Sequence, residues 1–84
     1  MKRQYYAIKD NLAETYMMPI LFENENTALR WFSGVVNSET ENKIIYDNPG
    51  DYELWKLASF DNQSGEMTAM LEKIATGLSV KKGV

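Results

Sequence analysis

The sequence contains no histidine and no cysteine, and these two absences exclude several kinds of site. Without cysteine there is no disulfide, no thiolate metal ligand and no thiol nucleophile. Without histidine the usual proton shuttle at neutral pH and the commonest zinc ligand are missing as well. An enzyme would need a carboxylate pair such as Glu53 with Asp51 or Glu66, but solvated turn and strand-edge charges explain these acids better. We therefore expect a protein that is not an enzyme and holds neither metal nor cofactor.

Long hydrophobic runs are also missing. Residues 1–6 lack the apolar run of a signal peptide, and no segment approaches the roughly 20 apolar residues of a membrane span. We expect a soluble protein of the cytoplasm, with no membrane contact. The 84 residues predict a single α+β domain over residues 1–78 and a C-terminal tail over 79–84 that frays. A core of this size is often completed by a partner, which favours a homo-oligomer.

Basic residues are in short supply, since the formal net charge is −3. A domain that binds nucleic acid mainly through phosphate contacts usually carries a surplus of Lys and Arg. The bases are nevertheless unevenly placed, with Lys2, Arg3 and Lys9 in the first strand region and Lys81 and Lys82 near the end. They would form a small basic patch if the two ends of the chain met. The simpler interpretation, solvated termini that keep the chain soluble, is favoured.

The most decisive local pattern runs from Tyr52 to Phe60 and predicts a strand. Its residues alternate between two faces, with Tyr52, Leu54, Lys56, Ala58 and Phe60 on one and Glu53, Trp55, Leu57 and Ser59 on the other. Neither face is cleanly polar, because both carry bulky apolar side chains. Such a strand is usually central in its sheet, with a helix on one face and a second cover on the other. Residues 61–65 then read as a hairpin loop with Gly65 in the left-handed conformation.

Two further strands are predicted before the helix. Residues 3–9 read as the first strand, with Tyr6 and Ile8 on one face and Tyr5 and Ala7 on the other. The apolar run over residues 16–22 contains Pro19, which cannot donate to a ladder, so this second strand is expected to be short and at the rim of the sheet.

One main helix is predicted from Asn24 or Asn26, either of which can cap it, to Asn37 or Ser38. Its apolar stripe comprises Ala28, Trp31, Phe32, Val35 and Val36. After Gly65 the spacing of apolar residues fits a helix while the hairpin requires a strand. We favour a short strand over residues 66–70, followed by a helical turn that Gly77 stops.

The predicted fold class is therefore α+β, a small antiparallel sheet of three or four strands with one main helix packed on one face. The face that the helix leaves bare still needs a cover. We expect a dimer that buries apolar surface there.

Three segments together carry a family resemblance: Tyr6-Ala7-Ile8-Lys9-Asp10, residues 48–55 (NPGDYELW) and residues 60–66 (FDNQSGE). In this order and spacing the chain resembles the small nonstructural protein of gokushoviruses, the tailless single-stranded DNA phages of the microvirus group. The resemblance covers roughly residues 1–66, and residues 67–84 depart from it.

The resemblance implies a protein made in the host cytoplasm, absent from the mature capsid and acting in genome replication. It suggests a non-enzymatic accessory role in the switch to single-strand synthesis, through binding of single-stranded DNA, the phage replication initiator or a host replication protein. The alternative is a host-directed protein interaction module that binds no nucleic acid. If DNA is bound, we predict phosphate contacts by Lys2, Arg3, Lys9 and Arg30 and base stacking by Tyr5 and Trp55. The competing interpretation makes these bases plain surface charges and both aromatics core or subunit contacts.

Overall fold

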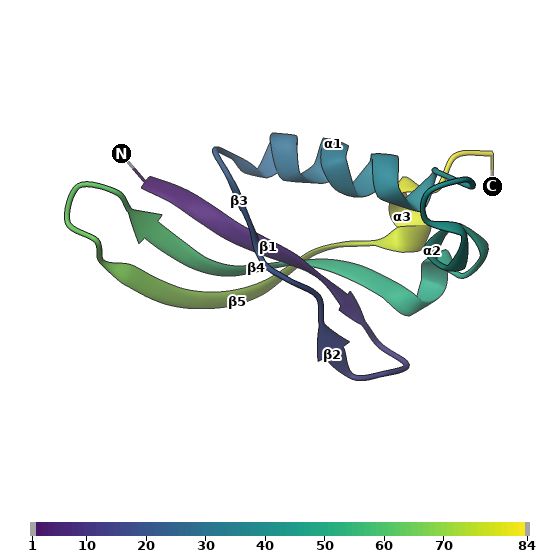
Figure 1. The fold of residues 1–84 in the computed structure, drawn as a ribbon, viewed down its shortest axis with the longest axis horizontal. Helices are drawn as coiled ribbons and strands as arrows, with labels where there is room; N and C mark the ends of the chain where they lie inside the picture. The colour runs from purple at the N-terminus through teal and green to yellow at the C-terminus, as the bar shows by residue number, and fades with distance from the viewer. Residues whose placement is uncertain (1, 84) are drawn as a thin grey trace.

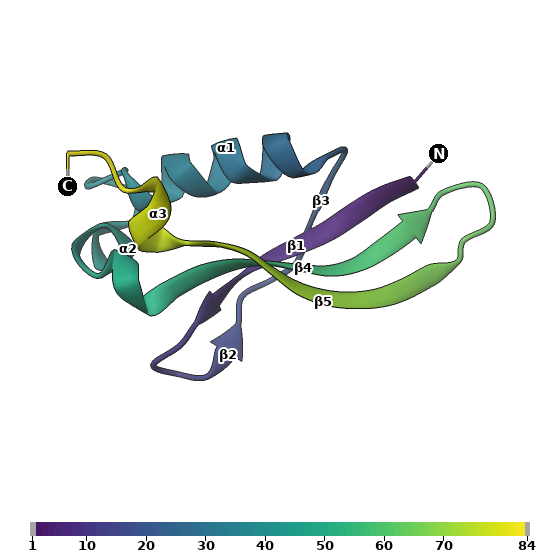
Figure 2. The ribbon, with the colours of Figure 1, turned by 180° about the vertical axis from the view of Figure 1, so that it is seen from behind.

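A computed structural model describes residues 2–83 and shows an α+β domain built on one antiparallel sheet (Figures 1 and 2). Its elements are β1 (Lys2–Asp10), β2 (Thr15–Tyr16), β3 (Ile20–Phe22), α1 (Glu25–Val36), α2 (Lys43–Asp47), the 3-10 turn η1 (Pro49–Asp51), β4 (Tyr52–Asp61), β5 (Met67–Thr76) and α3 (Gly77–Val80). The strand order is β2-β1-β4-β5, and β3 also pairs with β1. The predicted fold class is confirmed, with short extra strands at one rim.

The helix α1 covers one face of the sheet. It begins where predicted, because the Asn24 side-chain oxygen accepts a hydrogen bond from the Thr27 amide at 2.9 Å. Its buried stripe, Ala28, Phe32 and Val36, packs on the β1 and β4 side chains of the core. Those strand residues are Tyr6, Ile8, Tyr52 and Leu54. The core therefore lies between α1 and the central strand pair.

A β-bulge at Leu57 corrects the predicted alternation of β4. Tyr5 pairs with Ala58 but Tyr6 pairs with Lys56, so Leu57 is an extra residue without a partner on β1. Before the bulge Leu54 and Lys56 share a face, as predicted, and the structure turns that face toward α1. After it the phase is reversed: Ala58 and Phe60 pair with Tyr5 and Arg3 and lie on the face away from α1. The prediction that Phe60 shares a face with Leu54 was wrong for this reason.

The C-terminal hairpin strand is longer than predicted. β5 runs for 10 residues, Met67–Thr76, where a short strand over 66–70 was expected, and Gly77 begins α3 instead of ending a helical turn. The apolar spacing that suggested a helix is broken by two register shifts against β4, one opposite Leu57 and one near Ile74. Local spacing was a poor guide here because each bulge changes the face that the next residue occupies.

The rim beside β1 matches the expectation from Pro19. The apolar run over 16–22 forms two short strands, β2 and β3, with residues 17–19 outside any strand between them. After α1, the short helix α2 returns Ile45 to the core.

Residues 80–82 of the expected tail contact the rest of the domain. Val80 packs against the core, and its carbonyl accepts a hydrogen bond from the Asn37 side chain at 3.0 Å. The Lys81 ammonium donates to the carbonyls of Val36 and Tyr46, at 3.4 and 3.0 Å, and so ties together the ends of α1 and α2. The start of β1, which holds Lys2 and Arg3, and α3 lie at opposite ends of the 42 Å long axis (Figure 1), so these two bases form no common patch with the C-terminal bases.

Two glycines provide a matched test of this packing. A Cβ at residue 77 would overlap the Pro49 carbonyl oxygen, whereas a Cβ at Gly34 would meet nothing within 4 Å. We predict that Gly77→Ala lowers the free energy of unfolding by about 1–3 kcal/mol through overpacking. Gly34→Ala, in the interior of α1, should raise it by about 0.5–1 kcal/mol. Urea denaturation of both variants measures this, and equal effects of the same sign would contradict the packing described for α3 and η1.

Candidate nucleic-acid interface

The face of the sheet away from α1 carries four aromatic side chains and three basic ones. We call it the open face. The odd-numbered residues of β1 lie on this face, and so do the residues of β2 and β4 that pair with them. The residues of β5 that pair with those of β4 complete it. Its ring-bearing and charged members are Arg3, Tyr5, Lys9, Tyr16, Glu53, Trp55, Phe60 and Lys73. The helix side, in contrast, is filled by the core.

Four rings form two pairs on the open face. Tyr16 meets Trp55 edge to face with 6.0 Å between ring centroids, and Tyr5 meets Phe60 at 6.3 Å. Tyr16 is 40% exposed, while the other three are half-buried. Trp55 stands opposite Ala7, two residues along β1 from Tyr5, so the two pairs are about 7 Å apart along the strand direction.

Lys9 lies over the Tyr16–Trp55 pair. Its ammonium is 5.5 Å from the Tyr16 ring centroid and 5.2 Å from that of Trp55, within the range of a cation–π contact. Among residues 2–83 no carboxylate lies within ion-pairing distance of Lys9. Its charge is therefore offset only by the ring faces, and remains available to an anion.

Glu53 is the acid nearest this cluster, since it pairs with Lys9 across the strands, but it is engaged elsewhere. Its carboxylate accepts a hydrogen bond from the Trp55 indole at 2.9 Å and forms an ion pair with Lys73 at 3.5 Å. Burial alone would raise the pKa of Glu53. Hydrogen bonds from Trp55 and Asn11, together with the positive charge of Lys73, outweigh the effect of burial and hold this pKa below its ordinary value. Glu53 thus fixes the orientation of the indole and neutralises Lys73.

The predicted site residues divide between the two sides of the molecule. Arg3, Tyr5, Lys9 and Trp55 share the open face, where Arg3 also forms an ion pair with Glu23 at 3.6 Å. Lys2 is exposed and pairs with Asp61, and strand alternation directs its side chain to the opposite side. Arg30 is exposed on α1. The structure therefore brings four of the six together and separates Lys2 and Arg30 from them.

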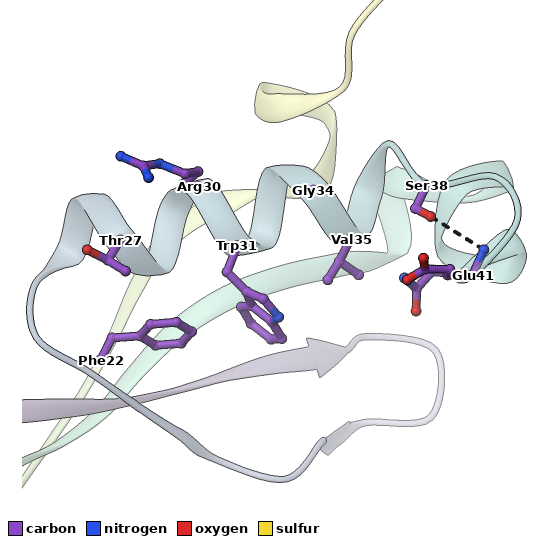
Figure 3. A pocket seen from close by; sticks show the side chains of 9 residues that line it. Phe22, Thr27, Arg30, Trp31, Gly34, Val35, Ser38 and Glu41 are labelled. Carbon is purple, nitrogen blue, oxygen red and sulfur yellow. Dashed lines mark hydrogen bonds between the residues drawn. The ribbon is translucent and has the colours of Figure 1, made fainter.

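Arg30 lines a different hollow, a groove of about 550 Å³ along α1. Figure 3 shows it with Phe22 and Trp31 at its floor and Glu41 at its far end. Within the described part of the chain no group of three or more metal-ligating residues occurs there or elsewhere. The two tryptophans consequently occupy different environments: Trp31 packs against Phe22 at 5.5 Å between centroids beside this groove, and Trp55 lies on the open face.

Three residues of the open face were not predicted from the sequence to lie there. Phe60 was placed on the wrong face because the Leu57 bulge could not be foreseen. Tyr16 was assigned to a short rim strand, and only the pairing of Lys9 with Tyr16 shows that it sits beside Trp55. Lys73 belongs to the part of β5 that was not predicted to be a strand. The signal available for Tyr16 was the Asp10–Asn11 turn, which favours a tight return of the chain beside Lys9.

Comparison with known proteins gives this chain a family. The model of the phage ORF5 protein family matches residues 3–80. The chain belongs to this family. Protein ORF5 of Chlamydia phage 1, a gokushovirus, is 32% identical over 63 residues, which make up 73% of this chain and 66% of that relative. The resemblance to gokushovirus proteins is confirmed.

The chain spans just under two thirds of the length of the Chlamydia phage relative that it matches. No solved structure matches the chain. Over residues 2–83 no helix has the length and apolar character needed to cross a membrane. Membership of the family makes this chain a microvirus protein, and the family description states no activity.

The engagement of Glu53 predicts a pH effect. Its folded pKa is depressed from the ordinary value of 4.5, so its contribution to stability is present above that value and is lost as the pH falls through the folded pKa. We expect Glu53→Gln to lower the free energy of unfolding at neutral pH and to flatten its decline between roughly pH 5 and pH 3. Urea titrations across that range measure both, and parallel acid profiles for the two proteins would contradict the assignment.

Proposed function

We propose that this member of the phage ORF5 family binds single-stranded DNA on its open face and acts as a non-enzymatic accessory protein of single-stranded DNA phage replication. The observation that carries the proposal is Lys9 lying over the Tyr16–Trp55 pair without a carboxylate partner among the described residues. Rings that present π-faces beside an uncompensated ammonium match the two parts of a nucleotide, its base and its phosphate.

Single strands suit this face better than duplex DNA. Bases in a duplex are stacked on one another and hidden from side-chain rings, whereas the bases of a single strand can be splayed and stacked on aromatic residues. The Tyr5–Phe60 and Tyr16–Trp55 pairs lie on a sheet, which holds them at a fixed separation. Two neighbouring stacking positions along β1 would therefore hold successive parts of one strand.

The charges predict weak binding by one copy of the chain. On the open face the charge of Arg3 is shared with Glu23 and that of Lys73 with Glu53, so Lys9 is the base with no acidic partner among residues 2–83. Each phosphate contact on a single strand contributes a slope of about −0.7 to the dependence of log K on log salt. We expect a shallow salt dependence and an affinity that depends mainly on stacking.

The place of action follows from the family and is part of the proposal. A microvirus protein that binds single strands would act in the host cytoplasm, in the switch from duplex replication to single-strand synthesis, and would be absent from the mature capsid. The phage replication initiator and host replication proteins are its expected protein partners. The host-directed interaction module that binds no nucleic acid is the outcome if DNA binding fails.

Lys9→Glu and Arg30→Glu form a matched pair for testing the open face. Both replace an exposed or half-buried base by an acid, but only Lys9 lies on that face. Titration of labelled oligothymidylate and duplex DNA at two salt concentrations should show that the wild type prefers the single strand. Lys9→Glu should weaken that binding and reduce its salt slope by about 0.7, while Arg30→Glu behaves much like wild type.

Removing a ring tests the stacking half of the proposal. Tyr16→Ala deletes an exposed ring from the Lys9 cluster and should cost about 1–3 kcal/mol of binding free energy if a base stacks there. Equal losses in Lys9→Glu and Arg30→Glu, or no single-strand binding by wild type at low salt, would overturn the proposal. In the second case an interaction with a protein partner becomes the better explanation.

A further inference from the structure

The two edges of the sheet are built differently. The β1 side ends in two strands of 2 and 3 residues separated by the segment that holds Pro19. Short edge strands and proline are devices that prevent another strand from pairing there. The opposite edge is β5, a strand of 10 residues that pairs with β4 on one side only. Its outer backbone amides and carbonyls are therefore open to a further strand, except near α3.

The first half of this edge is exposed and uncharged. All residues from Met67 to Lys73 are exposed, and no charged residue or proline occurs between Met67 and Leu71. Met67, Met70 and Leu71 are 57%, 46% and 59% exposed. Figures 1 and 2 show that this end of the β4–β5 hairpin extends beyond α1, so the helix covers neither it nor its edge.

Leu71 adds a second, independent observation. Its φ of 47° is in the left-handed region, which costs a branched residue about 1–2 kcal/mol. Its side chain is largely exposed, so packing within the chain does not repay that cost. The backbone thus holds an exposed leucine at the edge of β5. Met67, at the start of the same strand, lines an apolar groove of about 350 Å³ together with Tyr5, Pro19, Leu57 and Ala58.

We infer that a second copy of this chain pairs with the β5 edge, strand against strand and antiparallel, around a two-fold axis near Thr68. The open backbone groups of an edge strand are complementary to another extended strand, and the same uncharged segment supplies one in the second copy. In this register Thr68 faces its own counterpart, Met67 faces the partner's Ala69, and Glu66 faces the partner's Met70. No like charges are opposed, and Leu71 lies at the boundary between the two chains.

The contact differs from the dimer expected at the sequence level, which buried the bare face of the sheet. An axis between antiparallel neighbours is perpendicular to the sheet, so pairing at the edge leaves both open faces uncovered and directed to the same side. A contact of about five residues per chain lies at the small end of specific interfaces, and we expect a reversible dimer at high micromolar concentration. If the open face binds DNA as proposed above, two coplanar open faces give one DNA strand a longer platform.

Thr68→Lys and Thr40→Lys provide the test. Both threonines are exposed, but Thr68 lies on the β5 edge and Thr40 in the loop after α1. The two-fold axis sets the new lysine directly against its own copy, where like charges are destabilising. Sedimentation equilibrium without DNA should show a monomer–dimer equilibrium for wild type and Thr40→Lys, and a monomer for Thr68→Lys. A monomeric wild type, or equal dimerisation of both variants, would overturn the inference.

Leu71→Asn separates the contact from the stability of the fold. Asn tolerates the left-handed conformation, so the variant should unfold at the same urea concentration as wild type or a higher one, yet dimerise less. Dimerisation as strong as that of wild type would contradict the placement of Leu71 at the interface. Thr68→Lys should still bind a short oligothymidylate as a monomer, because the open face is unchanged. Loss of dimerisation can therefore be told apart from loss of DNA binding by the open face.

Discussion

The register of β1 against β4 is the constraint on which the rest of the structure depends. It pairs Ile8 with Leu54 on the side of α1 and Lys9 with Glu53 on the other side. Because side chains alternate strictly along each strand, this one register decides which residues form the core and which form the open face. A shift by one residue that paired Lys9 with Leu54 would put both on the same face, so either Lys9 would be buried under α1 or Leu54 would be exposed.

The bulge at Leu57 modifies that constraint in one place. It allows β4 to place Leu54 and Lys56 beneath α1 and then to turn Phe60 to the other side, where it meets Tyr5. On the helix side, Lys56 is nearly buried and forms ion pairs with Glu25 at 3.7 Å and Glu72 at 3.7 Å. A single inserted residue therefore gives the open face its second aromatic pair and gives the helix side a charged cluster linking α1 to β5.

The sequence predicted what is locally encoded. The Asn24 cap, the apolar stripe of α1, the Gly65 hairpin and the rim position of Pro19 all have short-range signals, and each is found in the structure. Four of the six predicted site residues share one face because β1 alternates regularly. The bulges in β4 and β5 have no such signal, since they are fixed by pairing between strands that are distant in space until the sheet forms. Phe60 and the length of β5 were missed for that reason, whereas Tyr16 was missed because its position beside Trp55 depends on the pairing of β2 with β1.

The two tryptophans offer the most direct test of the claim that the open face binds single-stranded DNA. Trp55 lies on that face, and Trp31 lies beside the groove on α1. Replacing one of them by phenylalanine leaves a single fluorescent reporter on a known side of the molecule. The account predicts that oligothymidylate quenches the emission of Trp55 in Trp31→Phe and leaves that of Trp31 unchanged in Trp55→Phe. Quenching of Trp31 instead, with Trp55 unaffected at saturating DNA, would contradict it.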